Sequence, residues 1–112
     1  MLPKTNRIKK KKDFERIFRN SKSFKNSLFI FRIAENNLGF NRFGFVVSLK
    51  ISKKATIRNK VRRRMVGAIK SKSESIKNGT DLILIALPGI EKKEFSEIKD
   101  AIGDALIKSN LI

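Results

Sequence analysis

The chain is predicted to fold as a single α+β domain in which helices pack against a mixed β-sheet. Three observations predict this class. The 112 residues suffice for one compact domain but not for two, and 40% of them are hydrophobic, enough for a core. Segments rich in β-branched and aromatic residues alternate with segments whose apolar residues recur at helical spacing. No internal repeat and no long linker divides residues 1–112.

The chain begins with a basic segment followed by a short helix. Residues 1–12 contain few apolar side chains, and we expect a flexible or extended arm. Its candidate auxiliary contacts are Arg7, Lys9, Lys10, Lys11 and Lys12. Phe14, Ile17 and Phe18 then recur at helical spacing, which predicts a helix that ends near Asn20. The sequence SKS that follows is typical of a loop.

Two strands are predicted next. SLFIFRIA (27–34) is dense in β-forming residues, and the turn-rich ENNLGFNR follows it. FGFVVSLK (43–50) predicts the second strand, in which alternation places Ser48 and Lys50 on the face opposite Phe45.

The second half of the chain adds a helix, a strand and a helix. Ser52 is the predicted N-cap of a helix over 55–70, whose buried stripe includes Val61. The unbroken apolar run DLILIAL (81–87) predicts a central strand that is buried on both faces. A final amphipathic helix is expected over 91–107. The resulting order, α-β-β-α-β-α, predicts a two-layer sandwich.

The charge of the chain points to a polyanionic partner. Lys and Arg number 27 against 10 Asp and Glu, a formal net charge of +17. Residues 1–72 hold 22 basic and 3 acidic side chains, whereas residues 73–112 hold 5 and 7. Nucleic acid is the first candidate for the partner, and an acidic membrane surface is the second. The N-terminal part of the chain is expected to meet it.

Composition also disfavours several functions. The chain has no His and no Cys, so it lacks the usual groups for acid–base or nucleophilic catalysis and cannot form disulfides. Its ten acids offer no cluster for two-metal chemistry, and we expect no catalytic residue and no metal site built from the protein alone. The basic N-terminus lacks the apolar run of a signal peptide, and no apolar run could span a bilayer, so we expect a cytoplasmic protein.

The stretch ATIRNKVRRRM (55–65) carries the strongest functional signal. Five of its eleven residues are basic and no acid lies nearby. Arg58 with Arg62 and Asn59 with Arg63 are four apart, so each pair shares one flank of the helix. A merely solvated helix face would gain from alternating charges, so nucleic-acid binding is favoured. The lysine run is less specific, and a solubilising tail is a comparable interpretation.

The pair Phe14 and Phe18 has two interpretations. Packing in the core is the default for aromatic residues on one helical face. The alternative is a partly exposed platform on which unpaired bases stack, each contributing about 1–3 kcal/mol.

Over nearly its full length, the chain resembles the protein subunit of bacterial ribonuclease P. KKDFERIF, RFGFVVS, ATIRNKVRR and DLILIALP occur in that family's order and spacing, and 58–63 is similar to its "RNR" helix, with Lys60 at a usual Arg. The resemblance implies a left-handed βαβ crossover, although about 98% of such connections are right-handed. It also implies that a large RNA subunit cleaves precursor tRNA with bound Mg²⁺, while the small protein binds that RNA and the single-stranded 5′ leader of the substrate.

Carried over by position, the resemblance assigns two sets of residues. The contacts with the RNA subunit would be made by Lys53, Lys54, Arg58, Asn59, Lys60, Arg62, Arg63 and Arg64. The leader contacts would be made by Phe14, Phe18, Arg32, Ser48 and Lys50. No cofactor is expected in the protein, and one protein is expected per RNA. Three positions depart from the family pattern: Arg32 replaces an aromatic residue, Leu49 a lysine and Val66 an arginine.

Two other functions fit the charge. A structural basic protein of ribosomal or nucleoid type would coat nucleic acid without preferring precursor tRNA. A nuclease acting alone would need catalytic groups, and the absent His and sparse carboxylates disfavour it.

Overall fold

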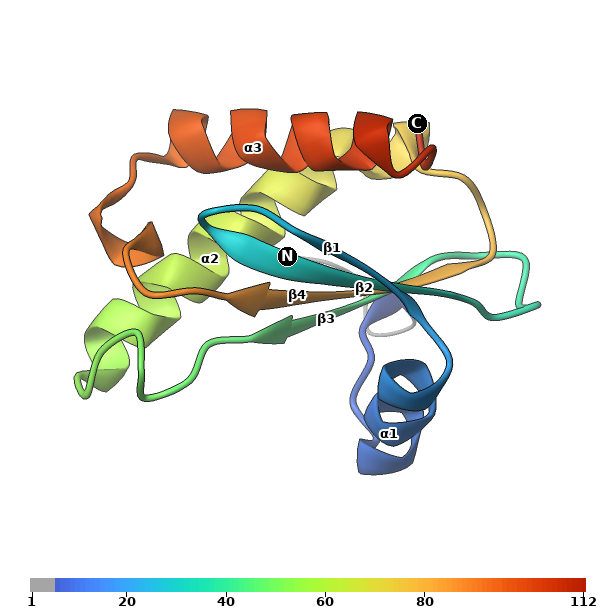
Figure 1. Ribbon diagram of the computed structural model, residues 1–112, viewed down its shortest axis with the longest axis horizontal. Helices are drawn as coiled ribbons and strands as arrows, with labels where there is room; N and C mark the ends of the chain where they lie inside the picture. Colours follow the sequence, from blue (N-terminus) through green and yellow to red (C-terminus); the bar gives the residue numbers. More distant parts are fainter. Residues whose placement is uncertain (1–5) are drawn as a thin grey trace.

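The protein forms a mixed four-stranded sheet with helices on both faces, in a computed structural model that describes residues 6–112. The helices and strands are α1 (Lys11–Arg19), β1 (Lys22–Lys25), β2 (Phe29–Glu35), β3 (Arg42–Val46), α2 (Ala55–Lys72), β4 (Thr80–Ala86) and α3 (Phe95–Lys108), with single 3-10 turns η2 (Ser73–Ser75) and η3 (Ile90–Lys92). Figure 1 shows their arrangement. The predicted α+β class and its mixed sheet are confirmed.

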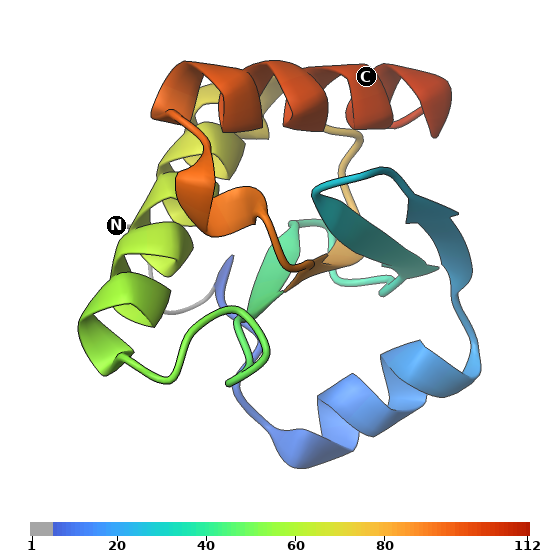
Figure 2. The same cartoon turned by 60° about the vertical axis from the view of Figure 1, so that its left-hand side comes forward.

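The strand order is β1-β2-β4-β3, with β4 parallel to β3 and antiparallel to β2. Strand β4 is therefore central, as its apolar run predicts: Leu82 and Leu84 pack on one face and Ile83 on the other, all fully buried. Helix α2 connects β3 to its parallel neighbour β4. Figures 1 and 2 show that this crossover is left-handed, as the resemblance implies.

The two faces of the sheet are covered unequally. Helices α2 and α3 cover one face and close the main core with side chains such as Met65, Ile69 and Ile102. Helix α1 packs alone on the other face, where Ile17 and Ile8 contact Ile83. Figure 1 shows α1 at one end of the sheet and the β3–α2 loop at the other. Much of this second face is left without a covering helix.

Two predictions about the strands are wrong. Strand β1 begins at Lys22, within the expected loop at SKS, and pairs antiparallel with β2, with Ser23 opposite Arg32. This four-residue edge strand has one apolar side chain among lysines, so its sequence carries little strand signal, and pairing with β2 decides its conformation. The strand predicted over 43–50 ends at Val46, because a turn follows in which the Ile51 N–H donates to the Ser48 carbonyl at 3.1 Å.

Two helix boundaries also differ from the prediction. Lys54, not Ser52, is the N-cap of α2, and the Ser52 hydroxyl instead accepts a hydrogen bond from the Lys54 N–H at 3.1 Å. The final helix starts at Phe95 rather than at 91, because η3 forms a separate turn before it. The Glu94 N–H donates to the Glu97 carboxylate at 2.8 Å and so fixes the start of α3.

The basic arm predicted over 1–12 is described only in part, since residues 1–5 lie outside the described residues. Arg7 forms a parallel bridge with Phe43, and the Ile8 N–H donates to the Phe43 carbonyl at 2.8 Å. Lys9 and Lys10 are exposed, and Lys11 and Lys12 lie exposed in the first turn of α1. At Arg7 and Ile8, the arm is therefore attached to the edge strand β3. Within 6–112, no helix is long and apolar enough to cross a membrane.

Candidate nucleic-acid interface

The first half of α2 presents its basic side chains on three flanks. Arg58 and Arg62 border the buried stripe of Val61 and Met65 and are half-buried, whereas Asn59 and Arg63 lie on the far side of the helix and are exposed. Nη1 of Arg58 donates to the Ser52 carbonyl at 2.9 Å. Nη1 of Arg62 donates to Asn59 Oδ1 at 2.9 Å, so Asn59 orients a guanidinium.

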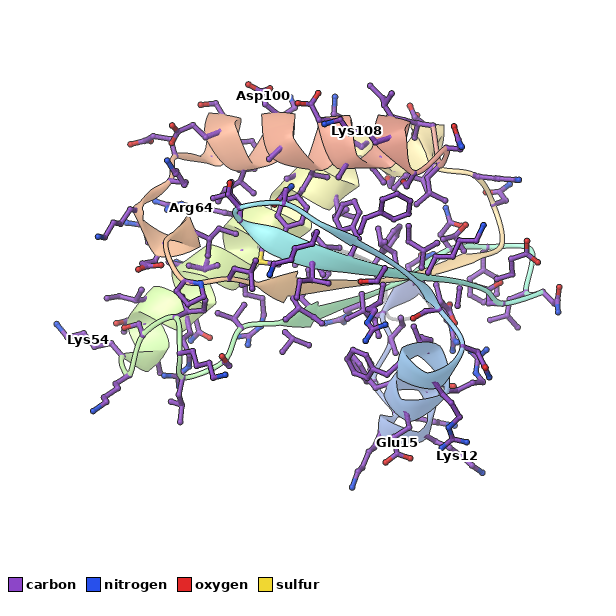
Figure 3. All side chains as sticks on the ribbon, in the orientation of Figure 1. Lys12, Glu15, Lys54, Arg64, Asp100 and Lys108 are labelled. Atoms are coloured by element: carbon purple, nitrogen blue, oxygen red, sulfur yellow. The ribbon has the colours of Figure 1, made fainter. Side chains whose placement is uncertain are left out.

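Among the described residues, no carboxylate forms an ion pair with this helix. The four ion pairs within residues 6–112 all lie elsewhere, and the first turn of α2 contains no acid. Lys53, Lys54 and Lys60 are also exposed, and Lys54 projects outward at the start of α2 in Figure 3. The exposed N–H groups and dipole of the helix N-terminus add positive potential at the same place. A phosphate backbone would relieve the repulsion among these charges.

Arg64 has a different environment from the other arginines of the helix. Its Nη1 donates at 2.7 Å to the carbonyl of Lys93, a residue between η3 and α3. In Figure 3, the Arg64 side chain lies toward that segment. The bond fastens α2 to the connection before α3, so Arg64 has a structural role whether or not it also contacts RNA.

Three of the residues predicted to bind the leader come together at α1. The Phe14 and Phe18 rings lie 6.4 Å apart between centroids, and Arg32 Cζ lies 5.6 Å from the Phe18 centroid. Phe14 packs so closely on the sheet that a Cβ at Gly44 would lie 2.9 Å from its ring. Phe14 is therefore partly a core residue, whereas Phe18 keeps 38% of its surface exposed.

The other two predicted leader residues lie at the opposite end of the open face. Ser48 and Lys50 are exposed in the β3–α2 loop, and the Ser48 hydroxyl accepts a hydrogen bond from the Lys50 N–H at 3.3 Å. The space between α1 and this loop is floored by half-buried apolar residues of the sheet, among them Val46 and Ile85. The predicted leader residues thus mark the two ends of one surface.

A buried charge network, which the sequence analysis did not identify, fixes α1 on the sheet. Asp81 is fully buried, and Arg42 binds it with two hydrogen bonds, Nε to Oδ1 at 2.8 Å and Nη2 to Oδ2 at 2.7 Å. Arg16 of α1 donates to Oδ2 at 2.9 Å, and Asn36 donates to Oδ1 at 2.9 Å. Arg42 also contacts Asp13 of α1 at 3.3 Å. Two residues of α1 are thus tied to β3 and β4.

The network determines the ionisation of its members. Burial raises the pKa of Asp81, but hydrogen bonds from Arg42, Asn36 and Arg16 and the charge of Arg42 lower it more, so the net pKa lies below the ordinary value. The hydrogen bonds and charge of Asp81 likewise hold the pKa of Arg42 above its ordinary value. A signal was present in the sequence: an acid at the start of a strand predicted to be buried on both faces needs a buried cation.

The carboxylates do not form a metal site within residues 6–112, where no three Asp or Glu side chains gather. Each Asp81 oxygen already accepts two hydrogen bonds from cationic or amide donors. This donor set does not fit a resident divalent cation.

Comparison with known proteins identifies the family. Residues 2–110 match the family model described as Ribonuclease P. The chain is 38% identical over 107 residues to the ribonuclease P protein component of Alkaliphilus oremlandii, covering 96% of this chain and 93% of the relative. It is 33% identical to the component of Clostridium acetobutylicum, covering 97% and 92%.

Solved structures agree with this match. A Staphylococcus aureus RNase P protein mutant with defective mRNA degradation activity superposes with a TM-score of 0.90 at 28% identity, covering 97% of this chain and 92% of the other. The RNase P protein from Thermotoga maritima gives 0.81 at 27% identity, covering 89% and 94%. Together with the unpaired cations of α2, these matches identify the chain as a member of the ribonuclease P protein family.

Proposed function

We propose that this protein is the RNA-binding subunit of ribonuclease P and assists removal of the 5′ leader from precursor tRNA. The observation that supports this role is the first half of α2, where Arg58, Arg62 and Arg63 have no carboxylate partner among the described residues. Family membership favours this role over that of a structural ribosomal or nucleoid protein.

In this proposal the reaction centre belongs to the RNA. The protein lacks His and Cys, and the carboxylates of residues 6–112 do not gather. Mg²⁺ bound by the RNA supplies the charge stabilisation of phosphodiester cleavage. The protein contributes cations where two RNAs approach each other, which lowers phosphate repulsion and so the Mg²⁺ concentration that the complex needs.

The fold supports a proposed division of the surface between the two RNAs. Helix α2 binds the RNA subunit, in one protein per RNA, and the open sheet face between α1 and the β3–α2 loop binds the single-stranded leader. Phe18 offers a stacking surface at one end, and Lys50 offers a cation for phosphate at the other. We place the complex in the cytoplasm, with its tRNA substrates.

The test is reconstitution with a bacterial ribonuclease P RNA at low Mg²⁺, measuring cleavage of precursor tRNA. The triple variant Arg58→Gln, Arg62→Gln, Arg63→Gln is compared with Lys92→Gln, Lys99→Gln, Lys108→Gln, which removes the same charge near and along α3. We expect the wild type and the lysine variant to restore cleavage and the arginine variant to fail. The log–log slope of RNA affinity against salt should become shallower in the arginine variant, by about 0.7–0.9 for each phosphate that the protein no longer neutralises.

Three outcomes contradict the proposal. Cleavage of precursor tRNA by the protein alone would mean that side chains of the protein catalyse the reaction. If the two triple variants were equally active, α2 would not be part of the interface with the RNA subunit. No effect of the wild-type protein on the RNA's activity would favour a coating protein.

A further inference from the structure

Arg32 lies on the open face of the sheet with its guanidinium held against an aromatic ring. It stands on β2 opposite Ser23 of β1 and Ile83 of β4, on the side where α1 packs. Its Cζ is 5.6 Å from the centroid of Phe18, within the range of a cation–π contact. The contact limits the rotamers of a long side chain, so the guanidinium is positioned before any ligand arrives.

The guanidinium of Arg32 has no polar partner within residues 6–112: it forms no hydrogen bond and no ion pair there. Asp81 is the acid that the four strands place on this face. Its two oxygens accept four hydrogen bonds from Arg42, Arg16 and Asn36 and are saturated. Of the acids on α1, Asp13 contacts Arg42 and Glu15 lies 3.9 Å from Lys11. The donors of Arg32 are left for an external acceptor.

The chemistry of this donor selects among the bases. A guanidinium offers two parallel N–H groups, which match two acceptors on one edge. Guanine presents such an edge, O6 with N7, whereas adenine pairs an acceptor with a donor and uracil alternates them. Unpaired cytosine offers N3 with O2, but its single ring stacks less well than the double ring of guanine. Phe18 is 38% exposed and lies next to Arg32, so it offers a bound base a stacking surface as well.

A second cation, Lys25, lies on the same face of the sheet as Arg32 and can contact the phosphate backbone of a bound nucleotide. Lys25 lies opposite Ile30, one pair along the same face, and it is exposed. An ammonium group meets phosphate without reading base geometry.

We propose that Arg32 is a specificity-determining residue that selects guanine at one position of the 5′ leader, with Lys25 contacting phosphate nearby. The proposal rests on the proposed function, in which this face binds the leader.

The test uses the reconstituted holoenzyme and precursor tRNAs whose uridine leader carries a single guanosine at each position in turn. Affinity is measured for each substrate. We expect one position at which guanosine binds more tightly than uridine or adenosine by about 5- to 150-fold, the range for a bidentate base contact. Replacing that guanosine by 7-deazaguanosine, which lacks the N7 acceptor, should abolish most of the gain.

Matched variants assign the preference to Arg32. Arg32→Lys keeps the charge but not the parallel donors, and it should weaken the guanosine preference while the salt slope stays unchanged. Lys25→Gln should weaken binding of all leaders alike and leave the preference intact. Arg32→Phe, which places an aromatic side chain at this position, should retain leader binding without the preference for guanosine.

The outcomes separate this proposal from the one on which it rests. If leader-bearing substrate binds more tightly than leaderless substrate while no leader position prefers guanosine, base reading by Arg32 is wrong. It is also wrong if Arg32→Phe keeps the full guanosine preference. If a methylphosphonate in the leader removes the contribution of Arg32 regardless of base, the residue binds phosphate instead. If the leader adds no affinity at all, the proposed leader function fails and this inference fails with it.

Discussion

The arginines of this protein fall into two groups with opposite surroundings. Arg16 and Arg42 converge on the buried carboxylate of Asp81, and both oxygens of that carboxylate are engaged. Arg62 and Arg63 stand on α2 with no acid among the described residues to pair with. The same side chain thus stabilises the fold in one group and is left for an external anion in the other.

The two groups of arginines differ in whether a carboxylate is near, and carboxylates are few in a protein of net charge +17. With few acids in residues 1–72, a carboxylate there is a scarce partner, and Asp13 contributes to the network at α1. Figure 3 shows Asp100 of α3 on the outer side of the fold, and none of the ion pairs within residues 6–112 joins an acid of α3 to α2. The positive field of α2 therefore remains available to RNA.

The largest effect is expected at the centre of the paired group. Asp81→Asn leaves the guanidinium groups of Arg42 and Arg16 without their buried counter-charge, and we expect the free energy of unfolding to fall by about 3–5 kcal/mol. Urea denaturation followed by circular dichroism measures it. Asp100→Asn, on a surface acid of α3, should change stability by no more than about 0.5 kcal/mol. If Asp81→Asn lowered the free energy of unfolding as little as Asp100→Asn, the network around Asp81 would not have the structural role described.

The pH dependence of stability gives a second view of the same carboxylate. Because the folded pKa of Asp81 is lowered, the unfolded chain takes up a proton at higher pH than the folded protein does. The stabilisation is complete above the unfolded pKa of about 3.9 and is lost as pH falls toward the folded value. The stability gap between wild type and Asp81→Asn should therefore narrow from about pH 5 to pH 3. A gap that stays constant over this range would argue against an ionised Asp81.

A smaller effect is expected where α1 touches the sheet. Gly44→Ala would place a Cβ 2.9 Å from the Phe14 ring and push the ring outward. Overpacking of this kind costs about 1–3 kcal/mol of stability. The displaced ring should also reduce the affinity gained from the leader, measured as the ratio between leader-bearing and leaderless substrates. Gly67→Ala, which approaches the Phe95 ring at 3.1 Å on the other side of the sheet, is the matched control and should leave that ratio unchanged.

The smallest effects are expected for single substitutions of Arg63 and Arg64, two neighbouring residues of α2. Arg63→Gln should weaken RNA-subunit binding by about tenfold, equivalent to one charged contact, with stability within about 0.5 kcal/mol of wild type. Arg64→Gln loses the bond to the Lys93 carbonyl and should cost about 1 kcal/mol of stability. Filter binding and urea denaturation on both variants provide the measurements. If Arg64→Gln weakened RNA binding as much as Arg63→Gln while stability stayed unchanged, the hydrogen bond from Arg64 to the Lys93 carbonyl would not stabilise the fold.

The sequence alone was enough to predict the features that depend only on residues close together in the chain. Helical spacing predicted α2, the apolar run predicted β4 as the central strand, and the unbalanced charges around Arg62 and Arg63 predicted an anionic partner. Each of these follows from residues within one or two turns or one strand, so local periodicity and charge suffice.

Tertiary structure alone decided which distant residues meet. Arg16 reaches Asp81 across 65 positions and Arg42 reaches it across 39, and both contacts depend on the order in which the strands pair. The same pairing makes β1 a strand and brings Arg32 to Phe18. No local pattern encodes these contacts, because a charge or an aromatic ring has the same sequence signature whether its partner is a carboxylate of the fold or a nucleotide outside it.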